Sequence, residues 1–335
     1  MISVHEIDDE QAYEAEASQC VGMTGYHHWF FLTAMAEAFH LKFRVFAVDA
    51  NGERLGLVPL LFRRRGPVST VNYLPIGCIG PLLRGETLRE GRVADLVKAV
   101  EPVLWRHRTA VTQWGFSPAV NVRPEHLAMP GFDVDEHESF VLPATKSPED
   151  CLKAMSRVRR QSIRQSEGHG LTVTDASAEE ITGWLPAQIG EAYQRQGAVV
   201  GYRPAEAQSM TEQLAAHPRM LWRTVKSADG DVVGMTGCVV GEDRLWGWLM
   251  AGPPLPGVSA QSLCYWDLIK WSLPKGLAYD LGAAPSPGIR SFKVSLGADI
   301  ETYPTAVRVR PRRVYNAARS FYNWRLTRLA ARQPS

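Results

Sequence analysis

The stretch that decides the predicted fold runs over residues 259–303 and reads SAQSLCYWDLIKWSLPKGLAYDLGAAPSPGIRSFKVSLGADIETY. Apolar residues recur at helical spacing in its first third, and a proline followed by Gly276 ends that helix. A short buried strand follows at 277–279, then a loop with two prolines, then a second short helix that Ser286 can cap. With a final strand at 301–309, the stretch predicts helices packed on a sheet.

The same stretch resembles the last part of the GNAT-like domain in the FemABX family. The resemblance rests on the strand that ends in Tyr-Asp-Leu-Gly at 279–282, on the motif G-I-x-x-F-K-x-x-x-G-A at 288–298, and on the tyrosine-bearing strand that follows. That family includes the aminoacyltransferases of peptidoglycan bridges and many bacterial acetyltransferase-like proteins. The resemblance implies an α/β fold with mixed sheets, two tandem GNAT-like domains, and acyl or aminoacyl transfer to an amine.

The resemblance also implies roles for residues of the motif. Lys293 matches the family lysine that supplies positive charge to the oxyanion formed during transfer. The alternative is a solvated lysine beside Arg290 on the polar face of the short helix. Phe292 is a candidate substrate contact next to Lys293, and Tyr303 is a further candidate that could equally be a packing residue.

Asp280 stands at the C-terminal end of its predicted strand. A carboxylate at that position can act as a base or can orient an acceptor. It can also simply accept hydrogen bonds from backbone amides of the loop at 283–288. Both interpretations stay open at the level of sequence.

Length and composition describe an ordinary globular protein. The chain has 335 residues, of which 45% are hydrophobic and 21% charged, and this length suits two domains. No apolar run approaches the roughly 18 residues of a membrane span, and the acidic N-terminus lacks a signal-peptide pattern, so we expect no membrane insertion and a cytoplasmic location. Five scattered cysteines predict neither a zinc site nor disulfides. The adjacent His27 and His28 would point about 100° apart on a helix, which argues against a metal site.

The predicted boundaries are 1–145 for an N-terminal, acceptor-side GNAT-like domain, 146–310 for a catalytic GNAT-like domain, and 311–335 for a basic C-terminal helix. Residues 306–335 hold eight of the 37 basic residues and no acidic residue. The rest of the chain therefore has 29 basic and 35 acidic residues and is mildly acidic. This tail could contact a polyanion such as tRNA. It could equally be a helix that packs on the body with its arginines in water.

Two arginine clusters are candidate sites for an anionic substrate. Arg63 and Arg64 end an apolar strand that the resemblance places beside the acceptor cleft. Arg157, Arg160 and Arg164 share one face of a predicted helix and could bind phosphates of donor or acceptor. In both clusters the arginines could instead be solvated surface residues.

The resemblance leaves two donors open, acyl-CoA and aminoacyl-tRNA, each as a cosubstrate, and implies no tightly bound cofactor. Acetyl-CoA enzymes bind pyrophosphate on a glycine-rich loop before a helix, whereas residues 252–260 read GPPLPGVSA, and proline has no amide proton to donate. The acceptor is expected to be an amine of a small molecule, a peptide or a cell-envelope precursor. Alternative functions are a non-catalytic scaffold and a tRNA- or polyanion-binding protein.

Overall fold

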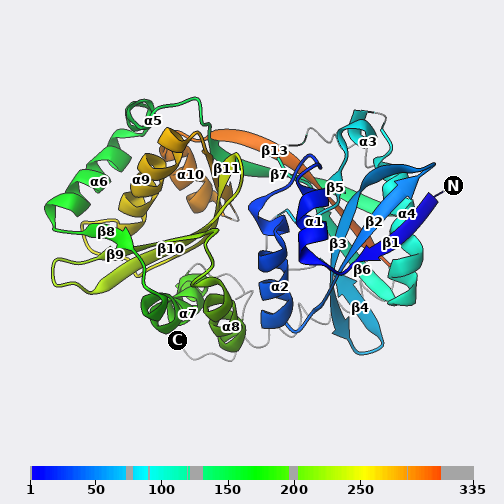
Figure 1. Cartoon of the computed structure of the whole chain (residues 1–335). Helices are drawn as coiled ribbons and strands as arrows, with labels where there is room; N and C mark the ends of the chain where they lie inside the picture. The colour runs from blue at the N-terminus through cyan, green and yellow to red at the C-terminus, as the bar shows by residue number, and fades with distance from the viewer. Residues whose placement is uncertain are drawn as a thin grey trace.

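The computed structural model describes residues 2–72, 78–89, 91–118, 120, 131–195, 203–284 and 286–310. It has two lobes that are joined by two long strands, β7 (Phe132–Leu142) and β13 (Asp299–Val309) (Figure 1). Within the described residues, none of the helices combines the length and the apolar character that crossing a bilayer requires. The fold is mixed α/β, as the sequence predicts.

The N-terminal lobe begins with a strand at residues 2–7 and contains a hairpin of two strands at 42–50 and 53–65. The apolar spacing over 87–106 predicts one helix, but this part of the chain forms two helices, and Gly91 adopts a positive φ of 66° between them. The elements of this lobe are β1 (Ile2–Ile7), α1 (Glu10–Ala17), η1 (Gly25–His27), α2 (Trp29–Ala38), β2 (Lys42–Ala50), β3 (Glu53–Arg65), β4 (Val68–Val71), β5 (Leu82–Leu83), α3 (Gly85–Arg89), α4 (Val93–Arg106) and β6 (Thr109–Gly115).

In the C-terminal lobe, one predicted helix is divided. The apolar spacing of Leu152, Met155 and Val158 predicts a continuous helix. In the structure the helix is interrupted at Met155, and Val158 is 70% exposed. Ser156 starts the second helix by accepting from the amide of Arg159. The elements of this lobe are α5 (Pro148–Ala154), α6 (Arg157–Gly168), β8 (Thr172–Asp175), α7 (Ala178–Arg195), α8 (Pro204–Leu214), β9 (Met220–Lys226), β10 (Val232–Val240), β11 (Arg244–Ala251), α9 (Ala260–Ser272), η3 (Leu273–Lys275), β12 (Ala278–Ala283) and α10 (Pro287–Ser295).

One sheet runs through both lobes, in the order β1-β2-β3-β4-β6-β13-β7-β12-β11-β10-β9-β8. The last described strand, β13, lies between β6 and β7, and β7 in turn pairs with β12. The two halves of the chain are therefore joined by backbone hydrogen bonds at the middle of the sheet. The boundary at 145/146 stays a prediction, and the predicted helix at 311–335 lies outside the described residues.

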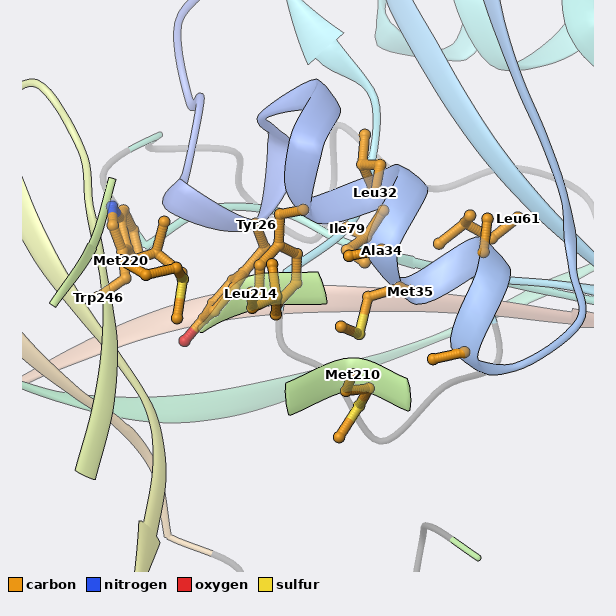
Figure 2. Packing of buried hydrophobic residues seen from close by; sticks show 14 of the residues in the cluster. Tyr26, Leu32, Ala34, Met35, Leu61, Ile79, Met210, Leu214, Met220 and Trp246 are labelled. Carbon is orange, nitrogen blue, oxygen red and sulfur yellow. The ribbon is translucent and has the colours of Figure 1, made fainter. Parts of the chain in front are cut away.

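Apolar packing also joins the lobes. A core cluster contains Tyr26, Leu32 and Met35 from the N-terminal half together with Leu214 and Trp246 from the C-terminal half. Figure 2 shows these side chains around α2, with Met210 of α8 beside them. Burial of this shared surface holds α2 against the C-terminal lobe and so fixes η1, which precedes α2, near β11.

Candidate active site

The site begins where two parallel strands part. β11 and β12 pair only at Arg244–Ala278, Leu245–Tyr279 and Trp246–Asp280. Immediately beyond, β11 carries a bulge, since Gly237 and Cys238 of β10 stand opposite Leu249 and Gly247 and leave Trp248 as the extra residue. A bulge bends its strand, and a cavity of about 700 Å³ opens between the diverging strands.

Residues from both faces of the sheet line the cavity. Tyr265, Leu281 and Phe292 line it and belong to the packing under α9 and α10. Tyr26 and Trp246 also line it and belong to the packing around α2 on the opposite face. Neighbouring strand residues point to opposite faces, so Asp280 faces the Tyr26 side. A molecule in this cavity therefore contacts side chains from both faces of the sheet.

Lys293 is buried beside this cavity, with 6% of its surface exposed. Its ammonium donates to the carbonyl oxygens of Gly282 at 2.9 Å and Ala283 at 2.7 Å, and also to that of Leu281. Burial lowers the pKa of Lys293 to about 8, against the opposing charge of Asp280. The solvated lysine that the sequence left open is therefore not observed.

Asp280 is held by three elements. Its Oδ1 accepts from the Ser139 hydroxyl at 2.6 Å and from the Gly282 amide at 2.7 Å. Its Oδ2 accepts from Arg244 at 3.2 Å, and Arg244 also donates to Glu301 at 2.9 Å. Burial raises the pKa of Asp280 even though these partners favour its charged form. Asp280 thus bonds a backbone amide and also faces the cavity.

Two other predicted substrate residues line the cavity. Phe292 stands at its α10 wall, and the Arg159 guanidinium lies 4.0 Å from the centre of its ring. Tyr303 of β13 is 8% exposed, and burial raises the pKa of its hydroxyl. The motif at 288–298 therefore brings Phe292 and Lys293 to one cavity with Asp280 and Tyr303.

The five predicted arginines lie elsewhere among the described residues. Arg63 packs over the Phe39 ring, and Arg64 is exposed and donates to the Gly66 carbonyl. None of the five is among the residues that line the cavity.

On α6, Arg160 donates to the carbonyls of Lys153 and Met155 at the end of α5, while Arg157 and Arg164 are exposed. Arg159, which the helical-face argument did not select, is the α6 residue that contacts Phe292.

Sequence reasoning also missed Tyr26, Ser139 and Arg244. Arg244 had a detectable signal, because it is a charged residue at the start of a strongly apolar strand. Tyr26 had no such signal in the sequence, since its role depends on contact between segments more than 200 residues apart: its hydroxyl donates to the Gly247 carbonyl at 2.8 Å.

The adjacent histidines next to Tyr26 have structural partners: His27 contacts Thr24 and the Gly80 backbone, and His28 contacts Glu14.

Comparisons with known proteins agree with this architecture. Residues 153–293 match the family model of the acetyltransferase (GNAT) domain. No curated protein matches the chain in sequence. Among solved structures it is similar to FemX, with a TM-score of 0.69 and 12% identity over 94% of this chain and 99% of that one.

Two further structures have similar folds. One is a tandem GNAT protein from the clavulanic acid biosynthesis pathway, with a TM-score of 0.56 and 12% identity over 92% of this chain and 98% of that one. The other is L-PGS from Bacillus licheniformis, with a TM-score of 0.55 and 14% identity over 90% and 92%. The chain thus has the tandem GNAT-like fold of these structures, and its residues 153–293 match the acetyltransferase (GNAT) domain.

Proposed function

We propose that this protein transfers an acyl or aminoacyl group from an activated ester or thioester to an amine, in the cavity between β11 and β12. The observation that carries the proposal is the burial of an amino and a carboxyl group, those of Lys293 and Asp280, at the wall of a cavity that residues from both faces of the sheet line. Donor and acceptor would enter from opposite faces and meet where the strands part.

The chemical step follows from these two groups. The neutral amine attacks the acyl carbonyl, a C–N bond forms, and the C=O electron pair moves onto oxygen. Collapse of this oxyanion breaks the C–O or C–S bond to the donor. The amine proton then passes to a base, a role that we assign to Asp280, and the leaving oxygen or sulfur finally takes up a proton.

Lys293 would stabilise the oxyanion through its charge. All three of its ammonium protons are directed at backbone carbonyls, so in this arrangement it supplies positive potential rather than a direct hydrogen bond. A fixed charge in a buried site needs no reorganisation during the reaction, and loss of one such group costs about 3 kcal/mol of barrier.

The backbone amides at the start of α9 help to distinguish the two candidate donors. The Ser259 amide donates to the Ser166 hydroxyl at 2.9 Å, and the Ser262 amide donates to the Ser259 hydroxyl at 3.2 Å. Two amides that could bind a pyrophosphate at this helix N-terminus therefore already have partners within the protein. This favours the aminoacyl ester of a tRNA over acyl-CoA, although both donors belong in the test.

The test is a product assay with each donor in turn. Purified protein is incubated with a panel of amines and either acetyl-CoA or a pool of charged tRNAs, and N-acylated products are detected by mass spectrometry. Lys293→Met should reduce turnover by about two orders of magnitude. Lys270→Met is the matched control, because Lys270 is exposed on α9, and it should retain the wild-type rate.

Each outcome decides a different part of the proposal. Turnover with one donor alone identifies that donor. Wild-type turnover by a folded Lys293→Met protein would remove Lys293 from the mechanism. Absence of product with both donors across the amine panel would contradict acyl transfer and favour a binding role for this fold.

A further inference from the structure

We infer that the acceptor is a compact primary amine with an apolar body, bound as its ammonium ion between Asp280 and an aromatic wall that includes Tyr26 of the N-terminal lobe. The inference rests on the proposed function, because it names the acceptor class for that cavity. The bound ammonium ion releases one proton to solvent and so becomes the neutral amine that attacks. Tyr26 is the positioning residue in this arrangement and does not take part in bond making.

The loop that carries Tyr26 is built to enter the C-terminal lobe. Thr24 and His27 close a capping box around η1, and His27 also contacts the Gly80 backbone. Gly25 fits where no side chain could, because an added Cβ would lie 2.8 Å from both Trp246 and Val239. Tyr26 is therefore held firmly at the cavity by groups on both sides of it.

Tyr26 stands at the point where β11 and β12 part. Its hydroxyl donates to the carbonyl of Gly247, the first residue of β11 beyond the last pair with β12. Its ring centroid is 5.9 Å from that of Trp246 and 5.4 Å from that of Phe31. In this arrangement, the Tyr26 ring forms part of the wall along which a nucleophile from this face would approach the point where the strands part.

Lys293 and Asp280 create regions of opposite electrostatic potential on the two sides of the cavity. Of the described residues that line the cavity, Asp280 and Lys293 are the ones with a carboxyl or an amino side chain. Lys293 is on α10, on the face with Phe292 and Tyr265, where positive potential suits an oxyanion and an anionic leaving group. Asp280 is on the Tyr26 side, where negative potential suits a cation.

The Asp280 carboxylate is not fully neutralised. Its Oδ1 has two donors, but Oδ2 receives only the 3.2 Å contact from Arg244, and Arg244 lies closer to Glu301. One guanidinium therefore serves two carboxylates, so Asp280, Glu301 and Arg244 together carry one excess negative charge, which the nearby Lys293 ammonium offsets only from the α10 side of the cavity. Burial raises the pKa of Asp280, so an added cation beside it would stabilise the ionised form.

The surrounding rings favour an ammonium on an apolar body. Tyr26, Trp246 and Tyr303 line the cavity around Asp280. Aromatic faces attract a desolvated cation and also bury apolar surface. A cavity of about 700 Å³ must hold the reacting ends of both substrates, which restricts the acceptor to a compact molecule.

The experiment measures binding to the full chain without any donor. Calorimetry compares 2-phenylethylamine with two analogues of similar shape, the neutral 2-phenylethanol and the anionic 3-phenylpropionate. The amine should bind at least about tenfold more tightly than either analogue.

Variants then test the two residues. Asp280→Asn should remove the preference for the amine, and Tyr26→Leu should weaken amine binding about tenfold. Tyr26→Phe keeps the ring and should lose less of the amine affinity. Trp105→Leu, at an exposed aromatic residue of α4, is the control and should bind like the wild type.

Equal or tighter binding of the alcohol or the carboxylate by the wild-type protein would overturn the inference, and this comparison needs no variant to fold. Wild-type amine affinity in a folded Tyr26→Leu protein would overturn the role of Tyr26. The proposed function fails separately: selective amine binding without transfer from either donor would contradict acyl transfer but keep the ammonium site. Transfer to amines without selective binding of the amine would support acyl transfer but contradict the ammonium site.

Discussion

Asp280 is fixed by residues from three different parts of the chain. Ser139 of β7, Arg244 of β11 and the Gly282 amide all donate to it, and Glu301 of β13 shares the arginine. The carboxylate therefore depends on the middle of the sheet being assembled. Its position in the cavity reports the packing of both lobes.

Arg244→Met should destabilise the protein by at least about 3 kcal/mol, because it leaves Asp280 without its cation in a buried site. Urea unfolding measures the change. Arg290→Met is the matched control, since the Arg290–Glu138 pair is largely exposed, and it should change stability by less than about 0.5 kcal/mol. Equal small effects of both substitutions would show that the Arg244 pair does not stabilise the fold.

At the scale of elements, the divergence of β11 and β12 depends on Gly247. An added Cβ there would lie 2.9 Å from the backbone oxygen of Asp280, which cannot move aside like a side chain. Gly247 also supplies the carbonyl that Tyr26 binds. A small residue at this position keeps the two strands at the spacing from which the cavity opens.

Gly247→Ala should therefore lower stability by about 1–3 kcal/mol and reduce acyl transfer. Gly183→Ala on α7 has no atom within 4 Å of the added Cβ and should instead stabilise by about 0.5–1 kcal/mol, with activity unchanged. Thermal unfolding and the product assay measure both effects. An alanine tolerated at 247 with full activity would show that the strand spacing is not fixed by Gly247.

Sequence patterns predict the helices and strands of this protein better than they predict where a helix is interrupted. The stretch at 259–303 gives helix, strand, helix and strand in the observed order, and places Lys293 and Asp280 in one neighbourhood. The break at Met155 was missed because helical spacing continues across it while the backbone does not. Spacing alone also groups Arg157, Arg160 and Arg164 on one face of α6, whereas Arg159 is the residue that contacts Phe292.

At the scale of the whole molecule, the cavity is a joint product of both lobes. Tyr26 and Cys78 come from the N-terminal half, and Tyr303 lies on β13, which pairs with β6 of that half. No local pattern predicts such contacts, because they depend on how distant strands are ordered in the sheet. The complete site therefore requires the assembled chain.

The pH dependence of turnover tests the central claim most directly, namely that the buried charge of Lys293 promotes acyl transfer. Burial lowers the pKa of Lys293 to about 8, so the charge is present below that pH and is lost as pH rises through it. Arginine remains charged across this range. The ratio of wild-type to Lys293→Arg rates, measured with one amine from about pH 6 to about pH 10, cancels the ionisation of the acceptor. We predict that this ratio falls as pH rises through about 8. A ratio that stays flat over the whole range would contradict the role of the Lys293 charge.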